Sequence, residues 1–185
     1  KEMRSLFGPN VLSSPKGGLS KNGIKEPATK QAGLDLSQIE GRCLAHYLWP
    51  FDGGSFAKEV IEGDIHTANQ MAAGLPTRDS AKTFFYALIY GVGAEKLSKI
   101  TGMNGKKLKQ TYYKNMPALA ELTKRVTSKA EDEGILKALD GRPIKIRSSH
   151  SALNFLLQSA GAIISKVWYN ICYDDITEEG FVYGK

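Results

Sequence analysis

The hydrophobic residues between positions 76 and 93 recur at the spacing of an α-helix. Thr77, directly after Pro76, is suited to cap the start of this helix, and Gly91 and Gly93 are suited to end it. Steps of three and four residues bring a set of apolar side chains onto one face, which we expect to be buried. These residues are Ala81, Phe84, Phe85, Leu88 and Ile89.

A second stripe of the same helix is basic and aromatic, with Arg78, Lys82, Tyr86 and Tyr90 at steps of four. The positive end of a helix dipole, a bidentate guanidinium and a lysine suit the phosphates of a nucleotide. Tyr86 then lies near the sugar, and Tyr90 is suited to stack on a base. The alternative is an ordinary amphipathic helix with solvated basic residues and half-buried tyrosines.

Helical periodicity dominates the rest of the chain as well. A short strand is expected over residues 31–36, and a helix follows it through residue 48. Asp64 is expected to cap a helix that Gly74 closes. Further helices are expected over residues 94–101, 106–115, 117–133 and 149–173, with a hairpin that turns at Asp140 and Gly141. We therefore predict an α+β fold that is predominantly helical.

The last of these helices carries two different stripes. Asn154 and Gln158 lie one turn apart, and their amides suit contacts in the minor groove of a duplex, where acceptors vary little among base pairs. The alternative is a pair of solvent-facing amides. The other stripe is apolar and is expected to be buried along its whole length. It consists of Leu153, Leu156, Leu157, Ala160, Ile164, Val167, Trp168 and Ile171.

The composition is that of a folded, basic protein, with 185 residues, 42% hydrophobic residues and a net charge of +6. The positive charge favours a polyanionic partner such as nucleic acid. Neither a membrane span nor a secretory signal is expected, which predicts a cytoplasmic protein with no membrane partner. Cys43 and Cys172 form no metal-binding or disulfide pattern and are expected to be reduced core residues.

Asp35 falls at the end of the expected strand. A carboxylate at the mouth of a sheet suits Mg²⁺ that bridges substrate phosphates, and a second ion about 3.5–4 Å away would activate an attacking hydroxyl. The alternative is that Asp35 only caps the following helix.

The string Arg78-x-x-x-Lys82 followed by Tyr90-Gly91, with Tyr86 midway, resembles motif B of the family A DNA polymerases. Residues 35–42, Asp-Leu-Ser-Gln-Ile-Glu-Gly-Arg, similarly resemble motif A of that family. The resemblance implies the fingers and part of the palm of a right-hand polymerase. Residues 1–48 would belong to the palm with motif A, 49–147 to the fingers, and 148–185 to a return to the palm that stops before motif C.

The resemblance also implies roles for individual residues around the substrate. Asp35 and the backbone carbonyl of Leu36 would hold Mg²⁺, and Glu40 would line the sugar pocket and exclude a 2′-hydroxyl. The string Asp64-x-His66-Thr also matches the family, and it implies that His66 contacts the β-phosphate. The remaining nucleotide contacts would come from Arg78, Lys82 and Tyr86, with Lys82 and Asp35 as catalytic residues.

The segment Ala-Leu-Asn154-Phe-Leu-Leu-Gln158 resembles the part of the family that contacts primer and template. Besides these two amides, the resemblance implies template or primer contacts for Tyr90 and His150. The implied partners are primer-template DNA and deoxynucleoside triphosphates. The implied reaction is attack of a primer 3′-hydroxyl on the α-phosphate, with two Mg²⁺ ions and release of pyrophosphate.

The resemblance implies a second carboxylate for the two-metal site, in a His-Asp-Glu turn after the long helix. None of the histidines at positions 46, 66 and 150 precedes an Asp. We therefore expect this ligand outside the chain, on the same or a second polypeptide, so that the 185 residues are a fragment or a split half that is inactive alone. If the protein is viral, the host cytoplasm is the expected location. Two alternatives stay open: a single-subunit RNA polymerase and a non-catalytic basic DNA-binding protein.

Overall fold

The structure is a computed structural model that describes residues 36–178, with the backbone alone for residue 173 and residues 175–178. Asp35 lies outside the described residues, as does all but the last residue of the strand expected over 31–36.

The chain divides into two compact units. Residues Gln38–Lys166 form the unit to which most of the described residues belong, and residues from Val167 onward belong to the other unit. The larger unit, Gln38–Lys166, includes residues of all three segments that were predicted for palm and fingers. That division into palm and fingers stays a prediction.

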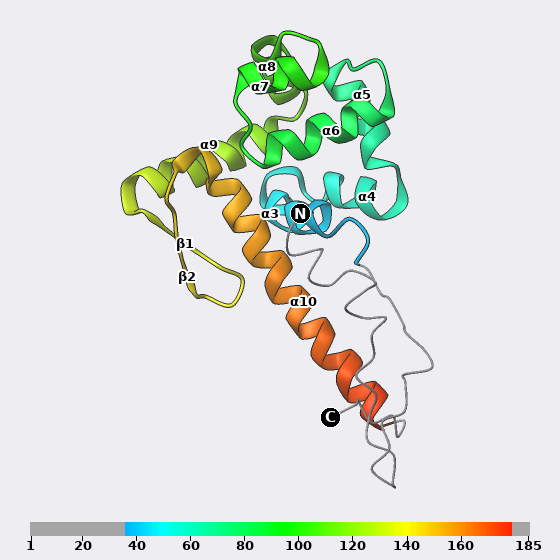
Figure 1. Ribbon diagram of the computed structural model, residues 1–185, viewed down its shortest axis with the longest axis vertical. Helices are drawn as coiled ribbons and strands as arrows, with labels where there is room; N and C mark the ends of the chain where they lie inside the picture. The colour runs from blue at the N-terminus through cyan, green and yellow to red at the C-terminus, as the bar shows by residue number, and fades with distance from the viewer. Residues whose placement is uncertain (1–35, 179–185) are drawn as a thin grey trace, which may run out of the picture. The chain divides into compact units, whose positions relative to one another are not determined.

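The described residues are mostly helical, as Figure 1 shows. Each helix that the periodicity predicts between residues 39 and 173 is present. Some helix ends differ by a few residues from the predicted ends. The elements in chain order are α3 (Ile39–Asp52), α4 (Ser55–Glu62), α5 (Ile65–Ala73), α6 (Arg78–Ile89), α7 (Ala94–Thr101), α8 (Gly105–Asn115), α9 (Pro117–Glu133), β1 (Ile135–Lys137), β2 (Pro143–Lys145), the 3₁₀ turn η1 (Ser149–Ser151) and α10 (Ala152–Glu178).

The ends of α5 and α6 are fixed by the residues expected to cap them. Thr77 accepts a hydrogen bond from the backbone N–H of Ser80 at 3.1 Å, and the Ser80 hydroxyl accepts one from the backbone N–H of Thr77 at 3.3 Å. This reciprocal arrangement satisfies two amides that a helix start leaves unpaired. Asp64 caps α5 by accepting a hydrogen bond from the backbone N–H of His66, and Gly74 ends α5 in the left-handed conformation.

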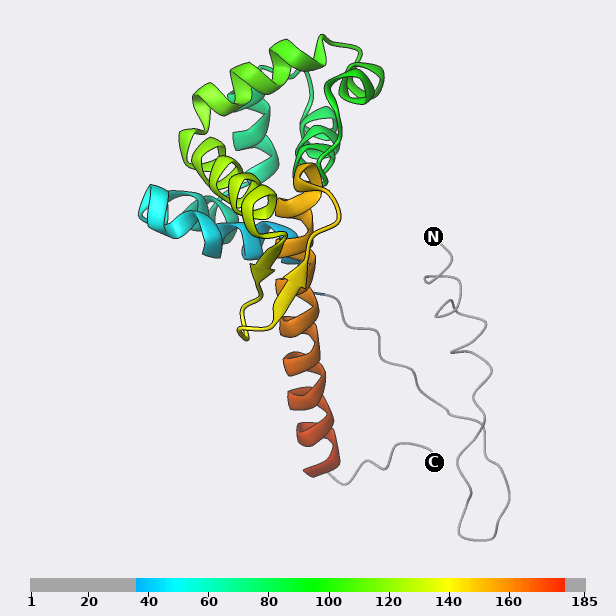
Figure 2. The same ribbon diagram turned by 90° about the vertical axis from the view of Figure 1, so that its left-hand side faces the viewer.

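The two strands form the predicted antiparallel hairpin. Leu136 pairs with Ile144, and the turn between the strands places Gly141 at a φ of 81°, which favours glycine. Residues of the hairpin and of α10 line a common surface pocket, so the hairpin lies along this helix (Figure 2).

The core of the larger unit forms around the apolar face of α6, and all the residues predicted for that face are buried. The Phe84 ring meets the Tyr112 ring edge-on, with 5.1 Å between their centroids. The Tyr112 hydroxyl in turn donates a hydrogen bond of 2.6 Å to Oδ1 of buried Asn69. Helices α5, α6 and α8 are therefore joined by aromatic packing and by one buried hydrogen bond.

The first turns of α10 also enter this core, but the expectation that its apolar stripe stays buried is wrong for the second half. Leu153, Leu156 and Leu157 are buried, whereas Val167 and Ile171 are 54% and 52% exposed. Ile164 is exposed as well, close to the end of the larger unit. Helical periodicity tells which side chains share a face, but not whether another element covers that face. Cys172, expected in the core, is only half-buried, while Cys43 is buried as predicted.

We expect Gly91 to be required for the turn that follows α6. Its φ is +75°, and a Cβ added there would lie 2.5 Å from the carbonyl oxygen of His150. Gly91→Ala should therefore lower the free energy of unfolding by about 2 kcal/mol or more, through the unfavourable φ and the backbone contact. Urea unfolding of the two proteins measures the difference.

Gly93→Ala is the matched control, because Gly93 has an extended backbone and no atom within 4 Å of an added Cβ. It should change the free energy of unfolding by less than about 0.5 kcal/mol. Equal effects of the two substitutions would contradict this account of the turn.

Candidate functional site

The basic and aromatic stripe predicted for α6 faces away from the core. Arg78, Lys82 and Tyr90 are exposed, and Tyr86 is half-buried. The Tyr86 and Tyr90 rings are neighbours, with 6.2 Å between their centroids. The positive charges thus lie at the start of α6 and the aromatic rings at its end.

His66, from the first turn of α5, lies beside this stripe. Its ring centroid is 6.0 Å from that of Tyr86, and the residue is only 4% exposed. Burial lowers the pKa of His66, and the charges of Arg78 and Lys82 lower it further, while Asp64 opposes them. His66 is therefore neutral at pH 7. Its Nδ1 is buried and has no hydrogen-bond partner within the described part of the chain.

Asp64 connects the start of α5 to the start of α6. Its carboxylate accepts from Nε of Arg78 at 2.6 Å and from Nη2 of Arg78 at 3.1 Å. The same carboxylate accepts from the His66 backbone N–H at 3.0 Å and from the Thr67 hydroxyl at 2.9 Å. These interactions, the Arg78 hydrogen bonds above all, hold the pKa of Asp64 well below its usual range. The guanidinium uses two of its five N–H groups here, and the remaining three suit an anion.

Glu40, in the first turn of α3, lies at the other end of the stripe. The Tyr90 hydroxyl donates to its Oε1 at 3.1 Å, across 50 positions of sequence. Burial raises the pKa of Tyr90, the neighbouring Glu40 charge raises it further, and a side-chain hydrogen bond with Gln158 lowers it. Residues from α3, α6 and α10, each predicted to contact a nucleotide or DNA, therefore meet around one tyrosine hydroxyl.

The start of α10 closes the same end of the site. The backbone of His150, in η1, lies against Gly91. Asn154 is half-buried, and its Oδ1 has no hydrogen-bond partner among the residues that the structure describes. The side chains predicted to contact primer and template thus come from two neighbouring regions, the end of α6 and the start of α10.

The structure describes only one of the two predicted metal ligands. Asp35 lies outside the described residues, and Leu36 is in a coil that the turn residues Ser37 and Gln38 join to α3. Residues 36–178 contain no group of three or more His, Cys, Asp or Glu side chains that could hold a metal ion. None of the described helices is long and apolar enough to cross a membrane.

The sequence did not indicate the pairing of Asp64 with Arg78. Asp64 was expected only to cap α5, and its 14-residue separation from Arg78 matches no local motif. The sequence does place an acidic helix cap before the basic start of the next helix. This order does not show that Asp64 and Arg78 meet, because their contact depends on the angle at which α5 and α6 pack.

The arrangement suits a ligand with a phosphate group at one end and a planar ring at the other. Arg78 and Lys82 supply charge and hydrogen-bond donors at the start of α6, where the helix dipole also favours an anion. Tyr86 and Tyr90 supply flat surfaces farther along, and Glu40 supplies an acceptor between α3 and α6. A nucleotide has this chemistry.

Comparison with known proteins identifies the family. Residues 22–182 match the model of DNA polymerase family A. The chain is 44% identical to the DNA-directed DNA polymerase of Enterobacteria phage T3 over an alignment of 199 residues, which covers 98% of the chain. It is 43% identical to the DNA-directed DNA polymerase of Escherichia phage T7 over the same length. The chain spans about 28% of the length of these two relatives.

The fold is also that of a polymerase segment. The structure is similar to the POL domain of Pol1 from M. smegmatis, solved in complex with DNA primer-template and dNTP, with a TM-score of 0.68 and 24% identity. The match covers 80% of this chain and 30% of that one. The fold is therefore that of part of a POL domain. The chain belongs to DNA polymerase family A, as motifs A and B predicted, and the predominantly helical α+β fold is confirmed.

Replacement of Asp64 by Asn should show that its charge holds Arg78. Asn retains an oxygen that can cap α5, so the substitution mainly removes the ion pair. Because the folded pKa of Asp64 is lowered, its stabilising effect is present above the unfolded pKa, about 4, and is lost as the pH falls through the folded pKa. The Tm of Asp64→Asn should therefore be a few degrees below that of wild type at pH 7, and the gap should narrow as the pH falls below about 4.

The control is the same substitution in an Arg78→Ala background, where little difference in Tm should remain. A gap that persists without Arg78, or that does not change with pH, would mean that Asp64 acts only as a helix cap.

Proposed function

We propose that this chain supplies the nucleotide-binding part of an enzyme that carries out template-directed DNA synthesis, transferring deoxynucleotides to a primer 3′-hydroxyl. One observation carries the proposal: a single surface brings together His66, Arg78, the α6 tyrosines, Glu40 and Gln158. Family membership supports the same function and supports neither an RNA polymerase nor a non-catalytic DNA-binding protein.

The triphosphate binds at the start of α6 in this proposal. Arg78 offers a planar fork of donors, and Asp64 fixes two of its N–H groups so that the rest point in a defined direction. Lys82, one turn on, supplies a second positive charge. His66 offers a phosphate a ring N–H as a hydrogen-bond donor, and burial lowers its pKa in the free protein. Preorganised donors of this kind stabilise charge that develops on a phosphoryl group in the transition state.

The sugar lies between Tyr86 and Glu40. The hydrogen bond from Tyr90 orients the Glu40 carboxylate, so its position does not depend on the nucleotide. A rigid side chain beside the 2′ position excludes a ribonucleotide by steric contact. Selection for deoxynucleotides therefore rests on Glu40, with Tyr90 as its positioning residue.

Primer and template contact the region where α6 ends and α10 begins. Gln158 and Asn154 carry amides that suit the acceptors common to all base pairs in the minor groove. Tyr90 offers a ring to the template base, and His150 borders the same surface.

Family A DNA polymerases use Mg²⁺, and the predicted ligands are oxygen donors of the kind that this ion prefers. In the proposal Asp35 and the Leu36 carbonyl hold it, and a second carboxylate comes from outside this chain, on the same or a second polypeptide. When bound, two Mg²⁺ ions would activate the primer hydroxyl and neutralise the phosphates. Leu36 lies four positions before Glu40 in the sequence.

Lys82→Ala tests the proposal in the full-length polymerase that contains this chain. Loss of a preorganised charge at the triphosphate should lower the single-turnover rate of primer extension by about 10²-fold or more. Lys96→Ala is the control, because Lys96 is an exposed lysine on α7, outside the stripe. Equal rates for wild type and Lys82→Ala would rule out the assignment.

Tyr86→Phe tests the placement of the sugar. If the Tyr86 hydroxyl lies near the 3′ position, it substitutes for the hydroxyl that a dideoxynucleotide lacks. Its removal should lower the use of dideoxynucleotides relative to deoxynucleotides by about tenfold, the equivalent of one hydrogen bond. Competition between the two substrates in primer extension measures this ratio, and an unchanged ratio would place the sugar elsewhere.

A further inference from the structure

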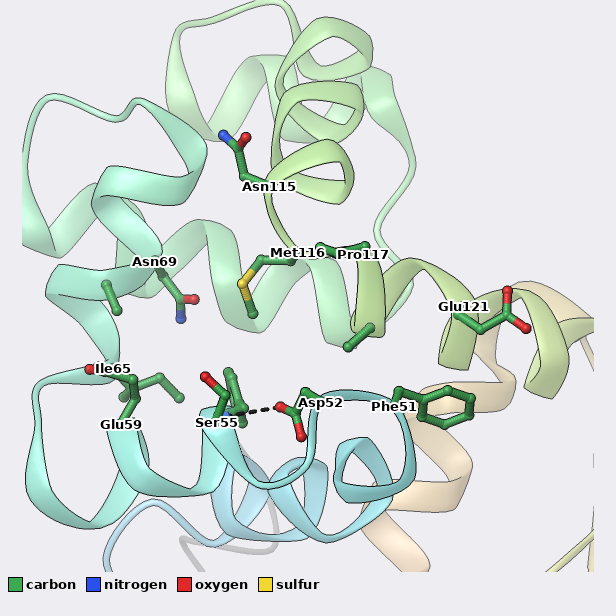
Figure 3. Close-up of a pocket in the computed structure, with 13 residues that line it drawn as sticks. Phe51, Asp52, Ser55, Glu59, Ile65, Asn69, Asn115, Met116, Pro117 and Glu121 are labelled. Carbon is green, nitrogen blue, oxygen red and sulfur yellow. Dashed lines mark hydrogen bonds between the residues drawn. The ribbon is translucent and has the colours of Figure 1, made fainter.

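A cleft with a volume of about 500 Å³ lies outside the candidate site. It opens between the end of α3, α4, α5 and the turn that joins α8 to α9, as Figure 3 shows. No residue of the α6 stripe lines it. Its volume lies in the range of roughly 300–1,000 Å³ that is usual for ligand sites, and it is large enough for one or two side chains.

The walls of the cleft are mainly apolar, and Phe56, Ile65 and Met116 contribute to them. Asn69 adds a hydrogen-bond donor. The residue is 1% exposed, and its Oδ1 accepts from the Tyr112 hydroxyl, but its Nδ2 has no partner within the described part of the chain. Figure 3 shows the Asn69 amide pointing into the cleft. A buried donor without a partner is unfavourable, so a ligand oxygen placed here would be stabilised.

The rim of the cleft is acidic in a protein that is basic as a whole. Asp52, Glu59 and Glu121 line it. Glu121 is already paired with Arg125 at 2.6 Å, whereas in the described part of the chain no Lys or Arg pairs with Asp52 or Glu59. The Asp52 carboxylate accepts from the backbone N–H groups of Gly54 and Phe56, each at 2.9 Å. An acidic rim repels phosphate, so this cleft is not a second site for nucleotide or DNA.

We propose that the cleft binds a segment of a partner protein that carries an apolar side chain next to a Lys or Arg. The apolar side chain fills the cleft, an oxygen of the segment accepts from Asn69 Nδ2, and the basic residue pairs with Glu59 at the rim. Because the α6 stripe lies outside the cleft, the segment can be bound while the nucleotide site is in use. A replication protein with an exposed basic and apolar segment fits this chemistry.

Selection of random displayed heptapeptides on the immobilised full-length polymerase tests the proposal. The selection is repeated on two variants with a substitution in α4. Glu59→Lys reverses a charge on the rim, and Glu62→Lys makes the same change at an exposed position outside the cleft. Peptides retained by wild type and by Glu62→Lys but lost from Glu59→Lys should contain an apolar residue beside Lys or Arg. Fluorescence anisotropy with one such synthetic peptide should show about tenfold weaker binding to Glu59→Lys.

Two further measurements keep the result interpretable. The Tm of each variant shows whether it is folded. Glu59→Gln removes the charge without reversing it, so it should weaken peptide binding less than Glu59→Lys. The proposal is overturned if no peptide depends on Glu59. It is equally overturned if the dependent peptides lack a basic residue, or if the dependence reflects self-association of the polymerase.

Discussion

Burial of the apolar face of α6 is the constraint on which the rest of the structure depends. Phe84 and Phe85 are almost completely inaccessible to solvent, and Phe84 packs edge-on against Tyr112 of α8. When this face is buried, the helical period places another stripe of α6 toward the surface. That stripe consists of Arg78, Lys82, Tyr86 and Tyr90. The same packing therefore supplies both stability and the binding surface. A substitution that rotated α6 would misplace the whole stripe together.

The two ends of the stripe are fixed in different ways. At the start, a single exposed carboxylate joins α5 to α6, and solvent can compete with that ion pair. At the end, Glu40 and Gln158 converge on Tyr90, and Gly91 lets the His150 backbone approach closely. The contact at the start leaves Arg78 donors available for an anion, whereas the contacts at the end bring three parts of the chain together. In the proposed function, this difference suits a site that admits the triphosphate at one end and contacts the sugar and base at the other.

The larger unit has a second surface with the opposite chemistry. The α6 stripe is basic and aromatic, whereas the cleft beside α4 and α9 is apolar with an acidic rim. Because the two surfaces carry opposite charges, the α6 stripe favours a polyanion and the cleft favours a cationic partner. The exposed apolar residues in the second half of α10 are a further surface whose partner the described residues do not include.

Local patterns in the sequence predicted the described α-helices other than α4, their caps at Thr77 and Asp64, the hairpin turn and the stripe of α6, because each depends on residues within a few positions of one another. The motif strings also identified the family, since they combine several specific residues at fixed spacing. Only the tertiary structure decided that Asp64 holds Arg78, that Tyr90 meets Glu40 across 50 positions, and that the stripe of α10 emerges from the core. Such contacts depend on the angles and distances between packed helices, and these follow from the sum of many side-chain contacts rather than from any one stretch of sequence.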